Sequence, residues 1–204
     1  MVDCAPEPVA VNILFVDLDG TLVATDVLWE ALLLAISANP LVLLQLPRWM
    51  TRGRAAVKRA LAQRVTPDPE RLPYNEEVLV FLRQEKRHGR TLVLATASDA
   101  IWAHAIAQHV GIFDDVLAST GQRNLKGAEK LKAITAYCQA HSFGTFAYIG
   151  DAIADLPIWE QAARQYVVGP SHRLLTALGK RKLPVTILRG QRSRFGSLLR
   201  LFGR

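Results

Sequence analysis

The stretch FVDLDGTLV, residues 15–23, decides the fold. Its apolar run ends in two carboxylates, Asp17 and Asp19, and the chain is expected to turn at Gly20. An apolar, β-branched run over residues 11–18 predicts a strand that is buried on both faces, as in a parallel sheet. In such sheets ligands sit beyond the carboxyl ends of the strands. The acid pair therefore marks the expected functional site.

Strands and helices alternate along most of the chain. Further strands are predicted at 91–98, 115–119, 146–151, 166–169 and 184–188, and helices at 75–88, 99–110, 126–140, 152–164 and 171–180. This alternation favours an α/β fold, a Rossmann-like parallel sheet flanked by helices on both faces. Half of the 204 residues are hydrophobic, which is enough for one sizeable core.

One connection breaks this rhythm directly after the first strand. The patterns there are helical, at 26–38, 40–50 and 52–64, and a proline-rich linker at 66–75 follows them. We interpret this insert as a small all-helical cap over the strand ends. The predicted division is an α/β core at 1–25 and 75–190, a helical cap at 26–74, and a basic C-terminal tail at 191–204.

Charge is concentrated near the C-terminus. The net charge is +7, and residues 161–204 hold ten of the 25 Lys+Arg and none of the 18 Asp+Glu. The final RSRFGSLLRLFGR spaces its apolar residues helically, with Arg200 and Arg204 on the other side. A basic amphipathic helix suits an anionic membrane surface or an acidic partner, and the alternative is a terminal helix packed on its own domain. Nucleic acid is not expected, because the tail lacks a recognisable binding fold.

The composition also bears on location. Cys4 and Cys138 have no paired or metal-type spacing, which indicates a reducing, cytoplasmic compartment. The N-terminal residues lack the basic and apolar regions of a signal peptide. Polar residues and prolines interrupt the most apolar stretch, 28–50, so we expect no spanning helix there. Buried cap helices or a helix dipping into a lipid surface fit better, with peripheral attachment to the inner membrane face or pairing of two caps as further expectations.

Polar residues stand where the predicted strands end. Asp17 and Asp19 follow the first strand, Thr96 and Ser98 end the second, Asp151 and Asp155 follow the FAYIG strand, and Lys126 opens the helix before that strand. In a parallel sheet all of these meet at one edge. The combination is far more specific than a lone D-x-D pair.

These residue types suggest phosphate chemistry. Converging Asp17, Asp151 and Asp155 on a phosphate ester requires a cation, because like charges repel strongly in a partly dry cleft. Oxygen ligands favour Mg²⁺, held by the carboxylates of Asp17 and Asp151 and the backbone carbonyl of Asp19. Asp17 would attack phosphorus to give an aspartyl phosphate. Asp19 would protonate the leaving alcohol and then activate water.

Other residues would assist this reaction. Thr96 Oγ and a backbone N–H near Ala97 would bind phosphoryl oxygens, and a lysine would neutralise the developing charge. Lys126 and Lys130, one helical turn apart, are the two candidates for this lysine. Asp155 would support the metal shell or orient Lys126.

Two further sets of candidates are less specific. Ser98 is a supporting candidate whose alternative role is to cap the next helix, and Asp99 is expected to be a cap. Trp49, Arg48 and Arg52 could form a basic rim on the cap that faces an anionic substrate or lipid head groups. The alternative for this rim is a solvated helix face.

The four clusters, DLDGT at 17–21, LVLATAS at 92–98, NLKGAEK at 124–130 and GDAIAD at 150–155, resemble the motifs of the haloacid dehalogenase superfamily of phosphohydrolases. The resemblance covers about 15–170, and the cap is similar to that of the phosphoserine-phosphatase-like branch. It implies a Mg²⁺-dependent phosphomonoester hydrolase with the roles given above for Asp17 and Asp19. It also favours Lys126, because family members often place the lysine in a Lys-Gly pair.

A narrower resemblance rests on DVLWEALL, LPYNEEVLVFLR and the same motifs. They are similar to the soluble domain found ahead of UbiA-type membrane prenyltransferases, and the chain would be a stand-alone relative or the soluble half of such a protein. This implies a lipid-linked or prenyl-pathway phosphate as substrate. Two alternatives remain: a phosphotransferase or mutase on the same site, and a non-catalytic regulatory domain that docks on a membrane prenyltransferase.

Overall fold

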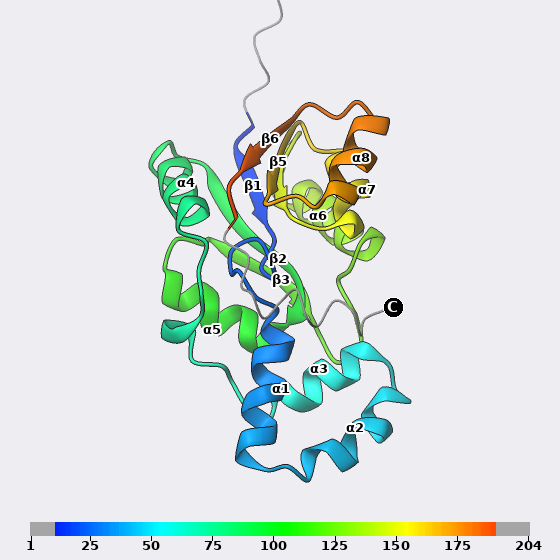
Figure 1. Ribbon diagram of the computed structural model, residues 1–204. Coiled ribbons are helices and arrows are strands. Elements are labelled where there is room, and N and C mark those ends of the chain that lie inside the picture. The colour runs from blue at the N-terminus through cyan, green and yellow to red at the C-terminus, as the bar shows by residue number, and fades with distance from the viewer. Residues whose placement is uncertain (1–10, 191–204) are drawn as a thin grey trace, which may run out of the picture.

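The strand predicted from the opening motif forms as β1 (Ile13–Val16) at the centre of a sheet. The computed structural model describes residues 11–190, and its six strands run in the order β3-β2-β1-β4-β5-β6, all parallel (Figure 1). Every side chain of β1 is fully buried. Burial on both faces explains why this run is continuously apolar rather than alternating.

The remaining elements of the core follow the predicted alternation. The strands are β2 (Thr91–Asp99), β3 (Asp115–Ser119), β4 (Ala147–Gly150), β5 (Arg164–Val168) and β6 (Val185–Leu188). The helices are α4 (Glu76–Arg87), α5 (Ala100–Val110), α6 (Ala128–Ala140), α7 (Leu156–Trp159) and α8 (His172–Lys180), with the 3-10 turn η2 (Ile153–Asp155). The predicted α/β fold class is confirmed.

Helices cover both faces of the sheet, with α4 and α5 on one side and α6, α7 and α8 on the other (Figure 1). Leu14 and Val16 belong to the hydrophobic core under α4 and α5, whereas Ile13 and Phe15 belong to the core under the other three helices. Burying each such side chain contributes about 1.5–3 kcal/mol. The alternating residues of one central strand therefore hold the two layers of helices on the sheet.

The insert after β1 is helical, as predicted. It contains α1 (Val27–Ala38), α2 (Val42–Met50), α3 (Arg54–Ala62) and the 3-10 turn η1 (Pro69–Arg71). Asp26 caps α1, since its side chain accepts a hydrogen bond from the backbone N–H of Leu28 at 2.9 Å. We call α1, α2 and α3 together the cap. It lies beyond the carboxyl end of β1, and α2 is its part farthest from the sheet (Figure 1).

The helix predicted at 152–164 is wrong. The segment folds as η2 and the single turn α7, and β5 already begins at Arg164. The Gln165 side-chain amide donates to the carbonyls of Trp159 and Ala162, at 3.2 and 2.6 Å. These are carbonyls that a continuing helix would have used, so this buried contact ends α7.

The sequence made two predictions about the membrane: that no helix spans it, and that the C-terminal tail suits its surface. Within residues 11–190, none of the helices has both the length and the hydropathy needed to span a bilayer. The predicted basic amphipathic tail at 191–204 lies outside the described residues, and the domain division as a whole stays a prediction.

Candidate active site

The turn after β1 is built from backbone hydrogen bonds. The N–H of Asp17 donates to the carbonyl of Ile149 in β4 at 3.0 Å, which continues the sheet by one residue. The N–H of Val23 then donates back to Leu18 O at 3.0 Å, and the N–H of Gly20 to Val23 O at 2.8 Å. These bonds close a tight loop that holds both acids of the motif at the carboxyl edge of the sheet.

Gly20 lets the loops after β1 and β4 come together. Its φ is +80°, and a Cβ at this position would lie 2.4 Å from Asp151 Oδ2. A side chain here would be strained by the backbone and would also displace the Asp151 carboxylate. The sequence assigned Gly20 only to the turn after the strand, and the structure adds that the absence of a side chain lets the Asp151 carboxylate approach this turn.

Replacing Gly20 with alanine is expected to weaken Mg²⁺ binding as well as folding. Gly89 is a matched control, because its φ is also +80° but nothing lies within 4 Å of an added Cβ. Both variants should lose about 1 kcal/mol of unfolding free energy from the left-handed backbone. Only Gly20→Ala should raise the Mg²⁺ concentration needed for half-maximal stabilisation in thermal unfolding. An equal Mg²⁺ requirement in the two variants would show that Asp151 does not depend on this contact.

Three carboxylates converge at this edge. Asp17, Asp151 and Asp155 each offer an oxygen, and these oxygens lie within 4.8 Å of one another. Among residues 11–190 this is the group of acidic, histidine or cysteine side chains close enough to share a metal ion. An all-oxygen donor set of this kind fits a hard cation such as Mg²⁺. The sequence placed Asp17 and Asp151 in this set, whereas the Asp19 carbonyl as a ligand stays a prediction.

Lys130 is the lysine that reaches these carboxylates. Its Nζ donates to Asp17 Oδ1 at 2.8 Å and to the Tyr148 hydroxyl at 2.9 Å, and it lies 3.4 Å from Asp155 Oδ1. The side chain is almost completely buried. The position expected for Lys126 is thus filled by its rival, and Lys126 is exposed in the segment before α6.

The backbone explains this correction. Gly127 has φ +57° and ψ −120°, so α6 begins only at Ala128. Lys126 lies before that break, where its backbone N–H donates to Asn124 O at 2.9 Å. Lys130 falls in the first turn of the helix, on the side that faces the sheet. Asp155 therefore contacts Lys130 and not the Lys126 that it was predicted to orient.

Burial decides the direction of the pKa shift of Asp17, whereas the neighbouring carboxylates decide that of Lys130. Burial raises the pKa of Asp17 to about 7, although the Lys130 ammonium opposes the shift. For Lys130, burial alone would lower the pKa, but Asp155 and Asp17 together raise it above its usual value. Lys130 is thus charged, while the carboxylates around it outnumber it. A divalent cation at this place would favour the ionised form of Asp17.

The pH dependence of metal binding should follow. The pKa of Asp17 is raised from 3.8 to about 7 in the folded protein, so the metal-free protein should lose stability as pH rises through that window. Mg²⁺ competes with the proton on Asp17, so its stabilising effect should be larger at about pH 8 than at about pH 5. The measurement is the Mg²⁺-induced shift in Tm at the two values, where 1 kcal/mol corresponds to roughly 2–4 °C. Equal shifts would contradict the assignment.

Two donors hold the Asp19 carboxylate, one at the start of the cap and one at the end of β2. The backbone N–H of Val27 donates to its Oδ1 at 2.8 Å, and the Ser98 hydroxyl donates to its Oδ2 at 2.7 Å. Burial raises the pKa of Asp19 to about 6, and the charge of Asp26 adds to the shift. A carboxyl with this pKa can hold a proton near neutrality and also release it.

The end of β2 orients Asp19. The Ser98 hydroxyl makes the contact just described, whereas the cap of the next helix is Asp99, and the backbone N–H of Ser98 donates to Thr96 Oγ1 at 2.9 Å. Thr96 is fully buried, and its predicted contact with phosphoryl oxygens stays a prediction. Asp99 caps α5 as expected, because its Oδ1 accepts the Ile101 N–H at 3.0 Å.

Sequence reasoning missed the role of two residues. The Tyr148 hydroxyl donates to Asp155 Oδ1 at 2.9 Å and accepts from Lys130, so it links the two. Its signal was a tyrosine inside a buried strand, where the hydroxyl needs a partner. Lys58 of α3 donates to the carbonyl of Ala97, which ties the cap to the end of β2. The insert contains several basic residues, and nothing in its sequence distinguishes Lys58 from the others.

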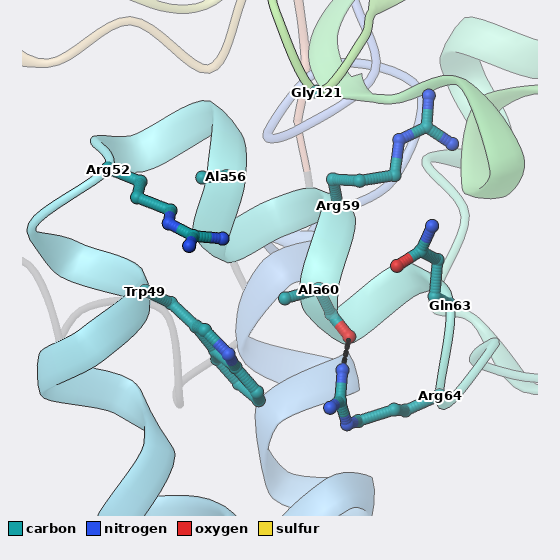
Figure 2. A pocket seen from close by; sticks show the side chains of 8 residues that line it. All are labelled: Trp49, Arg52, Ala56, Arg59, Ala60, Gln63, Arg64 and Gly121. Atoms are coloured by element: carbon teal, nitrogen blue, oxygen red, sulfur yellow. Dashed lines mark hydrogen bonds between the residues drawn. The ribbon is translucent and has the colours of Figure 1, made fainter.

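The three predicted specificity residues of the cap divide into two groups. Trp49 and Arg52 line a pocket of about 420 Å³ between α2, α3 and the loop at Gly121 (Figure 2). Arg59 and Arg64 line the same pocket. Arg48 is exposed and does not line this pocket.

The fold and the site define an α/β protein with a carboxylate and lysine centre at the sheet edge, under a helical cap. Residues 14–160 match the haloacid dehalogenase-like hydrolases, and the chain belongs to this family. It is 38% identical over 181 residues to the uncharacterized protein y4nM of Sinorhizobium fredii (strain NBRC 101917 / NGR234). That alignment covers 88% of this chain and 34% of the relative, so the chain spans about a third of that protein.

Solved structures share the fold. A haloacid dehalogenase family hydrolase, t0658, from Salmonella enterica serovar Typhi has a TM-score of 0.66 at 15% identity, over 95% of this chain and 72% of that one. An apo phosphoserine phosphatase has a TM-score of 0.62 at 14% identity, over 95% and 98%. A phospho-aspartyl intermediate analogue of phosphoserine phosphatase has a TM-score of 0.60 at 15% identity, over 94% and 98%. At these identities the likeness establishes a common architecture.

Proposed function

We propose that this protein is a Mg²⁺-dependent phosphomonoester hydrolase that acts through an aspartyl phosphate on Asp17. One observation carries the proposal: Asp17 lies in a cluster with Asp151 and Asp155, bonded to the buried Lys130. Membership of a hydrolase family and the shared fold with a phosphoserine phosphatase captured as a phospho-aspartyl analogue support it.

The residues divide the reaction into two steps. A carboxylate oxygen of Asp17 attacks phosphorus, and the bond from phosphorus to the ester oxygen breaks. Protonated Asp19 gives its proton to that leaving oxygen. The Asp19 carboxylate then takes a proton from water, and the hydroxide attacks phosphorus and releases inorganic phosphate and Asp17. The raised pKa of Asp19, about 6, suits a group that alternates between these roles.

The surrounding groups stabilise charge. Lys130 favours the ionised form of Asp17 and orients its carboxylate, and it takes the role first given to Lys126. Mg²⁺, held by Asp17, Asp151 and Asp155, would neutralise charge on the phosphoryl group. The Thr96 hydroxyl and a backbone N–H near Ala97 complete the proposed phosphoryl site.

The proposed substrate is a phosphorylated small molecule or a lipid-linked, prenyl-type phosphate. The exposed leucine side chains of the cap support the second class, because they suit a protein that meets its substrate at a lipid surface. The residues of the cap would choose among such esters.

A panel of phosphate esters that includes isoprenoid phosphates tests the proposal. The protein should release inorganic phosphate from at least one ester, lose this activity in EDTA, and regain it with added Mg²⁺. Full activity in EDTA would remove the metal from the mechanism. Free phosphate measured against phosphate passed to an added alcohol separates a hydrolase from a phosphotransferase, and no turnover of any ester would favour a regulatory domain.

A further inference from the structure

The cap exposes several large apolar side chains. Of the eleven large hydrophobic side chains that are exposed among residues 11–190, six lie between residues 33 and 50. We call these six the leucine patch: Leu33, Leu34, Leu41, Leu43, Leu44 and Met50. Their exposed fractions run from 45% to 77%. Single exposed leucines are ordinary, but a concentration of them on two consecutive helices and the turn between them marks an interaction surface.

Helix α2 has an apolar side that the protein itself does not use. Val42 and Trp49, two turns apart, face inward and are buried. Leu43 and Met50, also two turns apart, follow them around the helix and are exposed. A helix on the surface of a globular protein normally presents polar residues on its outer side. The outer side of α2 is therefore suited to a partner with an apolar interior.

The same segment is strongly basic. From residue 31 to residue 67 the sequence has no Asp or Glu, and its basic residues are Arg48, Arg52, Arg54, Lys58, Arg59 and Arg64. These give the segment a charge of +6, close to the whole-chain value of +7. A partner of this surface must accept positive charge as well as leucine side chains.

The pocket lined by Trp49 also carries basic side chains. Arg52 projects from the turn between α2 and α3, and Arg64 lies on the other side of Trp49 (Figure 2). The Arg64 guanidinium stacks over the Trp49 ring, 4.7 Å from its centroid, and donates to Ala60 O at 2.7 Å. Guanidinium groups beside a tryptophan at the end of an apolar surface are the arrangement that interfacial head groups favour.

We propose that the cap docks on an anionic lipid bilayer. The leucine patch enters the boundary between head groups and acyl chains, and Arg52 and Arg64 bind lipid phosphates in the pocket. An anionic bilayer satisfies both the apolar and the charged half of the surface. A second copy of the chain would satisfy only the apolar half, because it would bring another six positive charges against the first. This inference does not depend on the proposed hydrolase activity.

Co-sedimentation of the full chain with vesicles tests the docking. We expect it to bind vesicles of phosphatidylcholine mixed with phosphatidylglycerol, more weakly at high salt, and to bind pure phosphatidylcholine much less. The double variant Leu43→Gln, Leu44→Gln should lower binding to the mixed vesicles by about tenfold, because it removes apolar surface from the bilayer. Val80→Gln with Ile187→Gln, two exposed apolar residues elsewhere, should leave binding unchanged.

A second pair of variants tests the pocket. Arg52→Gln with Arg64→Gln should lower binding to the mixed vesicles about tenfold and flatten its salt dependence, because two phosphate contacts are lost. Arg83→Gln with Arg173→Gln removes the same charge from exposed positions outside the cap and should have little effect. All four substituted apolar positions are exposed, so we expect each variant to fold. Far-UV circular dichroism and thermal unfolding check this.

Two results would overturn the proposal. In the first, the cap variants bind vesicles as well as the wild-type chain does, and binding is lost only when the four arginines of residues 191–204 become glutamine. In the second, the wild-type chain binds no vesicles and sediments as a dimer that Leu43→Gln, Leu44→Gln dissociates. The second result would assign the leucine patch to another copy of the chain.

Discussion

Asp17→Asn should lower phosphate-ester turnover by about 10⁴-fold or more while the protein stays folded. An amide has the shape of the carboxylate but cannot attack phosphorus effectively, and loss of a nucleophile is among the most damaging single changes to an enzyme. The folded state should not suffer, because burial raises the pKa of Asp17 to about 7 and an amide avoids the cost of a buried charge. Steady-state kinetics checks the loss of turnover, and thermal unfolding checks that stability is retained.

The control for this variant is Asp68→Asn. Asp68 precedes η1 and its side chain is about half exposed, so the same chemical change there should leave turnover near the wild-type value. Asp17→Asn should also lose most of the Mg²⁺-induced rise in Tm at neutral pH, since it removes one ligand of the proposed site. More than a few per cent of wild-type turnover in Asp17→Asn would exclude Asp17 as the nucleophile.

Lys130→Met should abolish activity and destabilise the fold, whereas Lys126→Met should do neither. Lys130 is the cation that contacts Asp17 and Asp155 inside the protein. Its removal leaves two buried carboxylates without it, which for a broken buried pair costs about 3–5 kcal/mol. Turnover should fall by about 10³-fold or more, because a preorganised charge at the phosphoryl group is lost.

The matched pair makes this prediction sharp. Lys126→Met removes the same charge four residues earlier, from an exposed position. Excess Mg²⁺ should restore part of the stability of Lys130→Met, since a divalent ion also offsets the carboxylates, but it should not restore turnover. An inactive Lys126→Met together with an active Lys130→Met would assign the charge-neutralising role to Lys126 and would contradict the site described here.

The parts of this protein that the sequence predicted well are those that local patterns encode. A continuous apolar run can satisfy only a strand that is buried on both faces, and β1 is such a strand. Asp17 and Asp151 each follow a strand of that kind, and parallel strands carry their carboxyl ends to one edge, so their meeting could be inferred without coordinates. The helical insert was equally visible, because fifty residues without a strand pattern have to fold outside the sheet.

Contacts between distant residues decided the rest. The helix expected at 152–164 fails because Gln165 takes the carbonyls of Trp159 and Ala162, and no local propensity contains that information. Tyr148 joins the site because its hydroxyl faces Lys130 across the core. Ser98 acquires its contact with Asp19 from 79 residues away. In each case the contact joins residues that no local sequence pattern relates, so only the fold could bring them together.

The sequence by itself determined a parallel sheet, a helical cap, and acids gathered at one edge, since hydrophobic periodicity and strand direction fix those features. Only the tertiary structure decided which lysine meets the acids and which cap residues stay exposed. The reason is that a side chain's direction depends on where its helix begins. The break at Gly127 delays the start of α6 to Ala128, two residues after the predicted start, and Lys130 lies on the inward side of its first turn. The inward packing of Val42 and Trp49 leaves Leu43 and Leu44 on the surface.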